Sequence, residues 1–206
     1  MRKVKFFIYM IALVVIGVAL IALGTSTNKN LSKDPIDLYD SSVDWDDIKV
    51  GDHIEMDLPI VYDCYGSYEK DGKETARYYC LPLYNEQTGE ITNFIGIDVN
   101  DSSLYSDYDR LVDATDDWLA TPDLELPDVE TVHVSGIVKE QTKEQYEAHE
   151  EYLDACGFSD DVIENSQYKL YISPADKGET KILIIIGVLC LLGGLGGAAI
   201  SIVRKR

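Results

Sequence analysis

Two long apolar runs, one near each end of the chain, constrain the fold more than any other feature of the sequence. Residues 6–23 form an unbroken apolar run of 18 residues, and residues 182–203 form a second of 22 in which Ser201 is the one polar side chain. As helices, the runs would be about 27 and 33 Å long, enough to cross a hydrocarbon core of about 30 Å. The sequence therefore predicts two transmembrane helices, with the lipid bilayer as a partner.

Charge is sorted along the chain into basic ends and an acidic middle. All 37 acidic residues lie between Asp34 and Glu179, and residues 25–180 carry 11 basic residues, a net charge of −26. Basic residues flank the outer ends of both apolar runs: Arg2, Lys3, Lys5, Arg204, Lys205 and Arg206. Because Lys and Arg near membrane ends favour the cytoplasm, we expect a two-pass protein of the cell membrane with both termini cytoplasmic and an extracytoplasmic domain. Nucleic acid is excluded as a partner, since the acidic middle repels phosphate.

A cleaved signal peptide is the alternative interpretation of the first run. Residues 1–5 would form its basic region, and the Ala-Leu-Gly sequence at 22–24 offers the small residues of a cleavage site. The apolar stretch exceeds the usual signal core of about 7–15 residues, so we favour a retained helix.

The chain divides into five expected segments. The predicted division is an N-terminal transmembrane helix at 1–24, an acidic tether at 25–47, an extracytoplasmic domain at 48–174, a linker at 175–181 and a C-terminal transmembrane helix at 182–206.

Apolar residues that alternate with polar ones predict five strands in the outer domain. The alternation places them near residues 54–62, 76–84, 91–99, 132–138 and 168–172. A turn at Asp71-Gly72 and a loop at 85–89 suggest that the first three strands form a meander.

Helical spacing predicts two helices between these strands. Apolar residues recur every three or four positions from Leu104 to Leu119, and an acidic, proline-bearing loop follows to Asp128. Thr142 and Gln145 have the spacing of a capping box for a second helix, which Gly157 would end. This order predicts a small α+β domain with an antiparallel sheet or a partly open barrel, flanked by the transmembrane helices. An OB-like barrel also has its helix between the third and fourth strands, so we favour that form.

Four short segments carry a resemblance to a known group of proteins. They are Gly-Asp-His-Ile at 51–54, Tyr-Tyr-Cys-Leu-Pro at 78–82, Phe-Ile-Gly-Ile at 94–97 and Val-Ser-Gly-Ile-Val at 134–138. In these the chain resembles the uncharacterised two-helix membrane proteins of Gram-positive, Clostridia-type bacteria. The resemblance implies no activity that would transfer to particular residues.

No motif in the sequence indicates catalysis, a metal or a cofactor. The three histidines, His53, His133 and His149, lack the spacing of zinc ligands, and we expect them to be surface or half-buried side chains. The acidic clusters lack a calcium-binding loop and predict a solvated face. Cys64 and Cys80 would fall almost opposite each other in a hairpin, where they form either a disulfide or two small buried thiols.

Two groups of residues are candidates for binding partners. Six tyrosines gather around the first hairpin and form a candidate partner surface: Tyr62, Tyr65, Tyr68, Tyr78, Tyr79 and Tyr84. In the second transmembrane helix, small residues four apart predict close helix packing: Gly193, Gly197 and Ser201, beside a second row of Cys190, Gly194 and Ala198. Their partner is either the first helix, through Ala12 and Ala19, or a second copy or another protein.

These observations favour a non-enzymatic, membrane-anchored binding protein of the cell envelope, with a protein partner or self-association through the second transmembrane helix. A membrane-tethered envelope hydrolase that uses His53 or His149 beside acids is one alternative. A helix-packing accessory subunit of a larger membrane complex is another.

Overall fold

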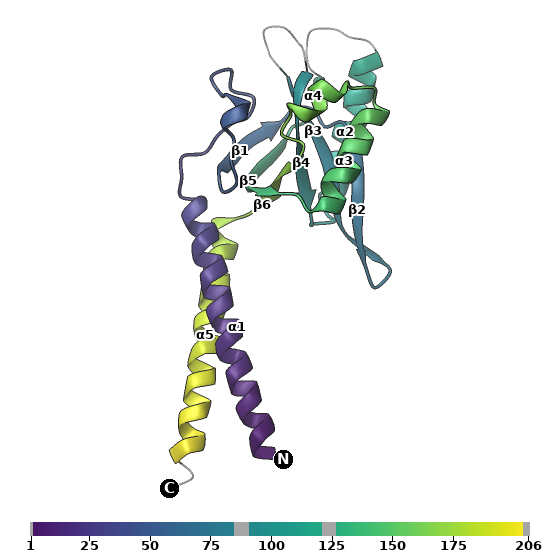
Figure 1. Ribbon diagram of the computed structural model, residues 1–206. Coiled ribbons are helices and arrows are strands. Elements are labelled where there is room, and N and C mark those ends of the chain that lie inside the picture. Colours follow the sequence, from purple (N-terminus) through teal and green to yellow (C-terminus); the bar gives the residue numbers. More distant parts are fainter. Residues whose placement is uncertain (1, 85–90, 121–126, 204–206) are drawn as a thin grey trace. The chain divides into compact units, whose positions relative to one another are not determined.

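The computed structural model describes residues 2–84, 91–120 and 127–203 (Figure 1). The chain divides into two compact units. One is a helical hairpin formed by Met1–Ser32 and Ala175–Arg206, and the other is a domain formed by Lys33–Pro174.

The hairpin consists of α1 (Arg2–Asn30) and α5 (Lys177–Val203), which lie side by side and run in opposite directions (Figure 1). Each contains a stretch long and apolar enough to span a membrane, Phe6–Asn30 and Lys177–Gly197. The sequence prediction of two such helices is confirmed in this respect.

Glycines spaced seven residues apart let α1 and α5 approach closely. A Cβ atom at Gly17 would lie 2.7 Å from the carbonyl oxygen of Gly187. A Cβ at Gly194 would lie 2.9 Å from the carbonyl oxygen of Met10. Only glycine fits at these places, because any side chain would meet backbone.

The close approach includes Gly197 and Gly194 from the two predicted rows of small residues, but not Gly193. A Cβ at Gly193 would meet no described atom within 4 Å, whereas one at Gly197 would meet the Met10 side chain. Ala12 and Ala19, the expected partners in α1, are exposed, and the side chain of Ser201 lies outside the described residues. Residues four apart drift around a helix, while residues seven apart stay on one face of an antiparallel pair.

The domain contains one six-stranded sheet with helices packed against it (Figure 1). Its strands are β1 (His53–Leu58), β2 (Cys64–Lys70), β3 (Lys73–Tyr84), β4 (Ile91–Val99), β5 (Val132–Glu140) and β6 (Leu170–Pro174). Its helices are the 3-10 turn η1 (Trp45–Asp47), α2 (Tyr105–Ala120), α3 (Lys143–Ala155) and α4 (Asp160–Glu164). The α+β class predicted from the sequence is confirmed.

The predicted barrel is wrong, because the sheet is open. The strand order is β1-β5-β6-β4-β3-β2, so β1 and β2 are its two edges. The expected meander of the first three predicted strands is also wrong, since β1 pairs with β5 and the meander is β2-β3-β4. The sheet is mixed rather than antiparallel, because β6 lies between β5 and β4 and runs parallel to β4.

Several local signals are confirmed. The β2–β3 turn has positive φ at Asp71 (54°) and Gly72 (73°), as a tight hairpin turn requires. The capping box holds, with the Gln145 side chain accepting from the Thr142 backbone N–H at 2.8 Å. Gly157, at φ 87°, ends α3. The loop predicted at 85–89 lies outside the described residues, as does most of the acidic loop after α2.

The segment expected to be a tether packs onto the sheet from Lys33 onward. Ile36 forms a parallel bridge with Ile54 of β1. Leu38 is fully buried in the main core, and its carbonyl accepts a hydrogen bond from the indole of Trp45 at 2.9 Å. A few apolar residues in a polar stretch were enough to join it to the domain.

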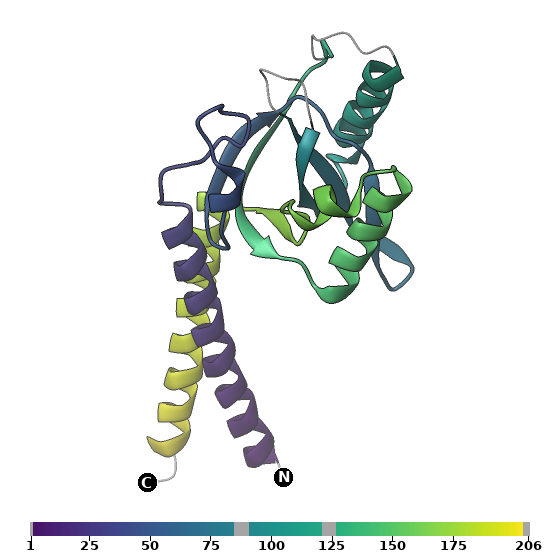
Figure 2. The same cartoon turned by 45° about the horizontal axis from the view of Figure 1, so that its top comes forward.

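Strands β3 and β4 are covered on both faces, by α2 on one side and by α3 and α4 on the other (Figure 2). On one face, Tyr79, Leu81 and Ile97 pack with Tyr108 and Leu111 of α2. On the other, Cys80 and Phe94 pack with Leu153 of α3 and Ile163 of α4. Alternate residues of β3 and β4 therefore serve two cores.

The cysteines are free thiols. Cys64 pairs with Tyr79 rather than with Cys80, so Cys64 and Cys80 point to opposite faces of the sheet. Of the two alternatives for this pair, the structure shows the unbonded one.

Candidate acidic groove and the histidine network beneath it

An acidic groove of about 510 Å³ lies between α3 and α4. Six of its seven lining residues are acidic: Glu147, Glu150, Glu151, Asp154, Asp160 and Glu164. The seventh is the apolar Ile163.

The local sequence explains why the acids gather there. In α3, His149 and Leu153 are buried four residues apart, so the acidic residues between and beside them fall on the outward side of the helix. Gly157 turns the chain back, and Ser159 starts α4, whose Ile163 is buried. The two amphipathic helices thus place their acidic sides along one groove.

Negative charge in the groove is almost uncompensated. Lys143 Nζ lies 3.4 Å from Glu147, both exposed on α3. Within the part of the chain that the structure describes, no Lys, Arg or His nitrogen lies within 4 Å of the other five carboxylates. Lys169 lies nearby, and its pKa is raised by hydrogen bonding to Tyr168, with a smaller contribution from Glu150.

Some acids elsewhere in the domain have a basic partner. Arg77 bonds to Asp109 and to Glu74, at 3.0 Å in each case, and its guanidinium lies 4.3 Å from the ring centre of Tyr105. What distinguishes the groove is that six carboxylates line one hollow, where their combined charge can attract a cation.

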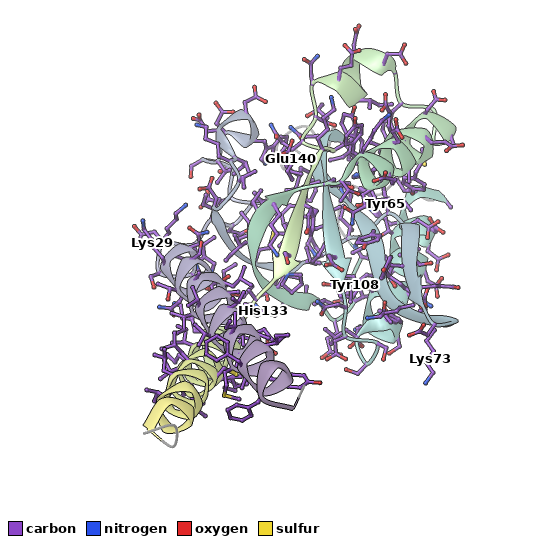
Figure 3. All side chains as sticks on the ribbon, turned by 60° about the horizontal axis from the view of Figure 1, so that its bottom comes forward. Lys29, Tyr65, Lys73, Tyr108, His133 and Glu140 are labelled. Carbon is purple, nitrogen blue, oxygen red and sulfur yellow. The ribbon has the colours of Figure 1, made fainter. Side chains whose placement is uncertain are left out.

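A buried histidine lies under the groove, on the inner side of α3. His149 is fully buried, and its ring stacks on that of Tyr65, with centres 4.1 Å apart and planes 3° apart. Tyr65 is labelled in Figure 3. Its Nδ1 lies 3.1 Å from the carbonyl oxygen of Tyr168, and its Nε2 has no hydrogen-bond partner among the described atoms. Burial lowers the pKa of His149 to about 4, against a smaller opposite effect of the Tyr168 carbonyl. The ring is therefore neutral at neutral pH.

Gln141 connects this histidine to the sheet. Its Nε2 donates to the carbonyls of Tyr168 and Leu170 at 2.6 and 3.2 Å, and its Oε1 accepts from the Tyr65 hydroxyl at 3.1 Å. Gly96 leaves room for the pair, since a Cβ there would lie 2.5 Å from the Tyr65 hydroxyl. The network anchors α3, and with it one wall of the groove, to β2, β6 and the end of β5.

In a comparison with known protein families, one family model matches residues 1–203. The match includes both apolar helices and the domain between them. The chain belongs to the family described as Domain of unknown function (DUF8577). Searches of the curated proteins and of the solved structures gave no match. The expectation that the chain belongs to a family without an assigned activity is confirmed.

The tyrosines predicted to form a partner surface do not form one in this DUF8577 domain. Tyr62, Tyr79 and Tyr84 are buried, and Tyr65 and Tyr78 are half-buried. Tyr68 alone of the six is exposed, at 56%. Tyr79 and Tyr84 are buried because β3 is covered on both faces, and Tyr62 packs into the core on the α3 side.

The expectation for two of the three histidines is also wrong. His149 is fully buried and His53 is 2% exposed, whereas the His133 side chain is 61% exposed. Backbone carbonyls of Tyr168 and Lys33 accept from the two buried rings, which makes their burial tolerable. The groove itself was missed, although the spacing of acids in α3 and α4 was a readable signal for it.

Proposed function

We propose that this DUF8577 protein is a two-pass cell-membrane protein whose extracytoplasmic domain binds a cationic partner in the acidic groove between α3 and α4. It acts as a non-enzymatic binding module of the cell envelope. The observation that carries the proposal is a hollow lined by six carboxylates, five of which have no Lys, Arg or His nitrogen within 4 Å among the described residues.

The orientation in the membrane rests on charge. Basic residues precede the apolar part of α1 and follow that of α5, while residues 25–180 have a net charge of −26. Positive ends are retained in the cytoplasm, and a loop between two spans then lies outside. The close glycine contacts between α1 and α5 support a retained first helix rather than a cleaved signal.

A lysine-rich or arginine-rich protein segment suits the groove best. Its charges would neutralise the clustered carboxylates, and Ile163 offers an apolar contact for the aliphatic stem of a lysine. Long-range attraction by the acidic domain would also speed encounter with such a segment.

Binding of a synthetic lysine-rich peptide to the full chain in detergent tests this proposal. The variant Glu150→Gln/Glu151→Gln/Asp154→Asn should bind about tenfold more weakly, because charge complementarity is lost at the contact. A matched control, Asp46→Asn/Asp113→Asn/Asp116→Asn, removes the same charge from exposed sites elsewhere and should change the affinity less than about twofold.

Calorimetric titration at two salt concentrations measures both affinities, and a glutamate-rich peptide should not bind. Equal losses of peptide affinity in the two triple variants would show that only the net charge matters, and would refute binding in the groove.

Cys156 tests the orientation, because it is exposed at the end of α3. In a Cys64→Ser background, a membrane-impermeant maleimide should label Cys156 in intact cells. A further Cys156→Ser change should abolish that labelling, since Cys80 is buried and Cys190 lies in α5. A cysteine added after Arg206 should react only after permeabilisation. Labelling of Cys156 that also requires permeabilisation would reverse the proposed topology.

A further inference from the structure

The ammonium group of Lys169 lies over two aromatic rings that meet as a corner. Its Nζ is 5.2 Å from the ring centre of Tyr168 and 5.8 Å from that of Tyr146. The two rings are nearly perpendicular, with an interplanar angle of 84° and centres 6.5 Å apart. Both distances fall within the range of about 6 Å in which the face of an aromatic ring attracts a cation.

This corner is continuous with the acidic groove through Glu150. Tyr146 and Glu150 are one turn apart in α3, so they project from the same side of the helix. Glu150 lines the groove and is also a hydrogen-bond partner of the Tyr168 side chain. Tyr146, Tyr168 and Glu150 therefore form an ammonium subsite at the edge of the groove, with Lys169 in it.

The walls of the ammonium subsite are held firmly, whereas its occupant is not. Tyr168 is 3% exposed, and Tyr146 packs against the core on the α3 side of the sheet. Lys169 is exposed, and among the described residues no carboxylate oxygen lies within 4 Å of its Nζ. A cation–π contact at an exposed site changes an equilibrium by only about two- to fivefold, so another ammonium group can replace this one.

We propose that Lys169 is an internal competitor, which occupies the ammonium subsite in the free protein and is displaced by a lysine side chain of the cationic partner. The inference rests on the proposed function and adds a means of selection to it. An isolated cation gains little by the exchange, because Lys169 is tethered beside the subsite and returns to it. A segment with several lysines also gains the groove carboxylates, so the competitor favours such a segment over single cations.

Binding of the synthetic lysine-rich peptide to the full chain in detergent tests the competition. Lys169→Gln should strengthen peptide binding by about three- to fivefold, because the subsite is then open. The matched control is Lys143→Gln, which removes the same charge from an exposed side chain that pairs with the groove residue Glu147 at 3.4 Å. It should strengthen binding less than about twofold at physiological ionic strength.

A second change, Tyr146→Leu, separates the aromatic subsite from charge alone. In the Lys169→Gln protein it should weaken peptide binding by about two- to fivefold, since the incoming lysine loses a ring. With Lys169 present it should change binding less than about twofold, because the competitor and the incoming lysine lose the same ring. Calorimetric titration of the four proteins measures this coupling.

Displacement itself can be followed by NMR of the full chain after reductive ¹³C-dimethylation of its lysines, which keeps their charge. The Lys169 methyl signal, identified by its loss in Lys169→Gln, should lie upfield of exposed lysines because the group lies over two rings. Saturating peptide should return it to the position of an exposed lysine.

Two outcomes would overturn the internal competitor and leave binding in the groove intact. One is peptide binding that leaves the Lys169 signal unmoved, and the other is an equal gain of affinity in Lys169→Gln and Lys143→Gln. A peptide that binds none of these proteins would instead refute the proposed function, and the competitor with it.

Discussion

Acidification from pH 6.5 to pH 4 should lower the free energy of unfolding of the domain by about 3 kcal/mol through His149 alone. The pKa of His149 is about 4 in the folded protein and about 6.5 when the chain is unfolded. Between these values the unfolded state binds a proton that the folded state does not, so stability rises with pH across this window and is lost as pH falls. Each pKa unit corresponds to about 1.4 kcal/mol.

Denaturant unfolding of the full chain at several pH values measures this effect, with His149→Phe as the reference. Phenylalanine keeps an aromatic ring against Tyr65 but does not titrate in this range. The many carboxylates titrate in both proteins, so their effect cancels in the difference between the two stability curves. The wild type should lose stability relative to the variant below about pH 6.5. Parallel curves would mean that His149 gains its proton without cost in the folded state.

Gln141→Leu should destabilise the domain by about 3 kcal/mol. Leucine fills a similar volume but removes the donor to the Tyr168 and Leu170 carbonyls and the acceptor of the Tyr65 hydroxyl. Each buried polar group left without a partner costs about 1–3 kcal/mol. The Tyr168 carbonyl keeps the His149 ring as a partner, so the loss falls mainly on Tyr65 and Leu170.

A double-mutant cycle separates this explanation from simple loss of packing. Tyr65→Phe removes the hydroxyl that Gln141→Leu would leave unpaired. The double variant should therefore be more stable than the sum of the single changes predicts, by about 1–2 kcal/mol. Equilibrium unfolding of the four proteins measures the coupling. Strict additivity would show that the two side chains do not depend on each other.

Both experiments concern the support of α3, the helix that carries most of the groove acids. If the network under α3 is weakened, peptide binding in the groove should weaken as well, because the carboxylates of α3 and α4 would no longer be held together. The thermodynamic and binding predictions are therefore linked through one helix.

The sequence by itself determined the elements that depend on near neighbours. Two apolar runs made the long helices α1 and α5, alternating residues placed most strands, and Thr142, Gln145 and Gly157 set the bounds of α3. The turn at Asp71-Gly72 followed from its residues. In each case the free energy is decided within one helix, strand or turn, so a short stretch of sequence contains the relevant contacts.

Only the tertiary structure decided which strands meet and which side chains are buried. β1 pairs with a strand some 76 residues away, and this pairing brings His133 to Asp57 and Glu55. The sheet is open where a barrel was expected, with β6 between β5 and β4, and cover on both faces of β3 buried Tyr79 and Tyr84. The alternation of residues along a strand shows which side chains share a face of the sheet, but not which element covers that face. Long-range packing supplies that cover, and it is why His53 and His149 are inside the domain while the acids of α3 and α4 line an outer groove.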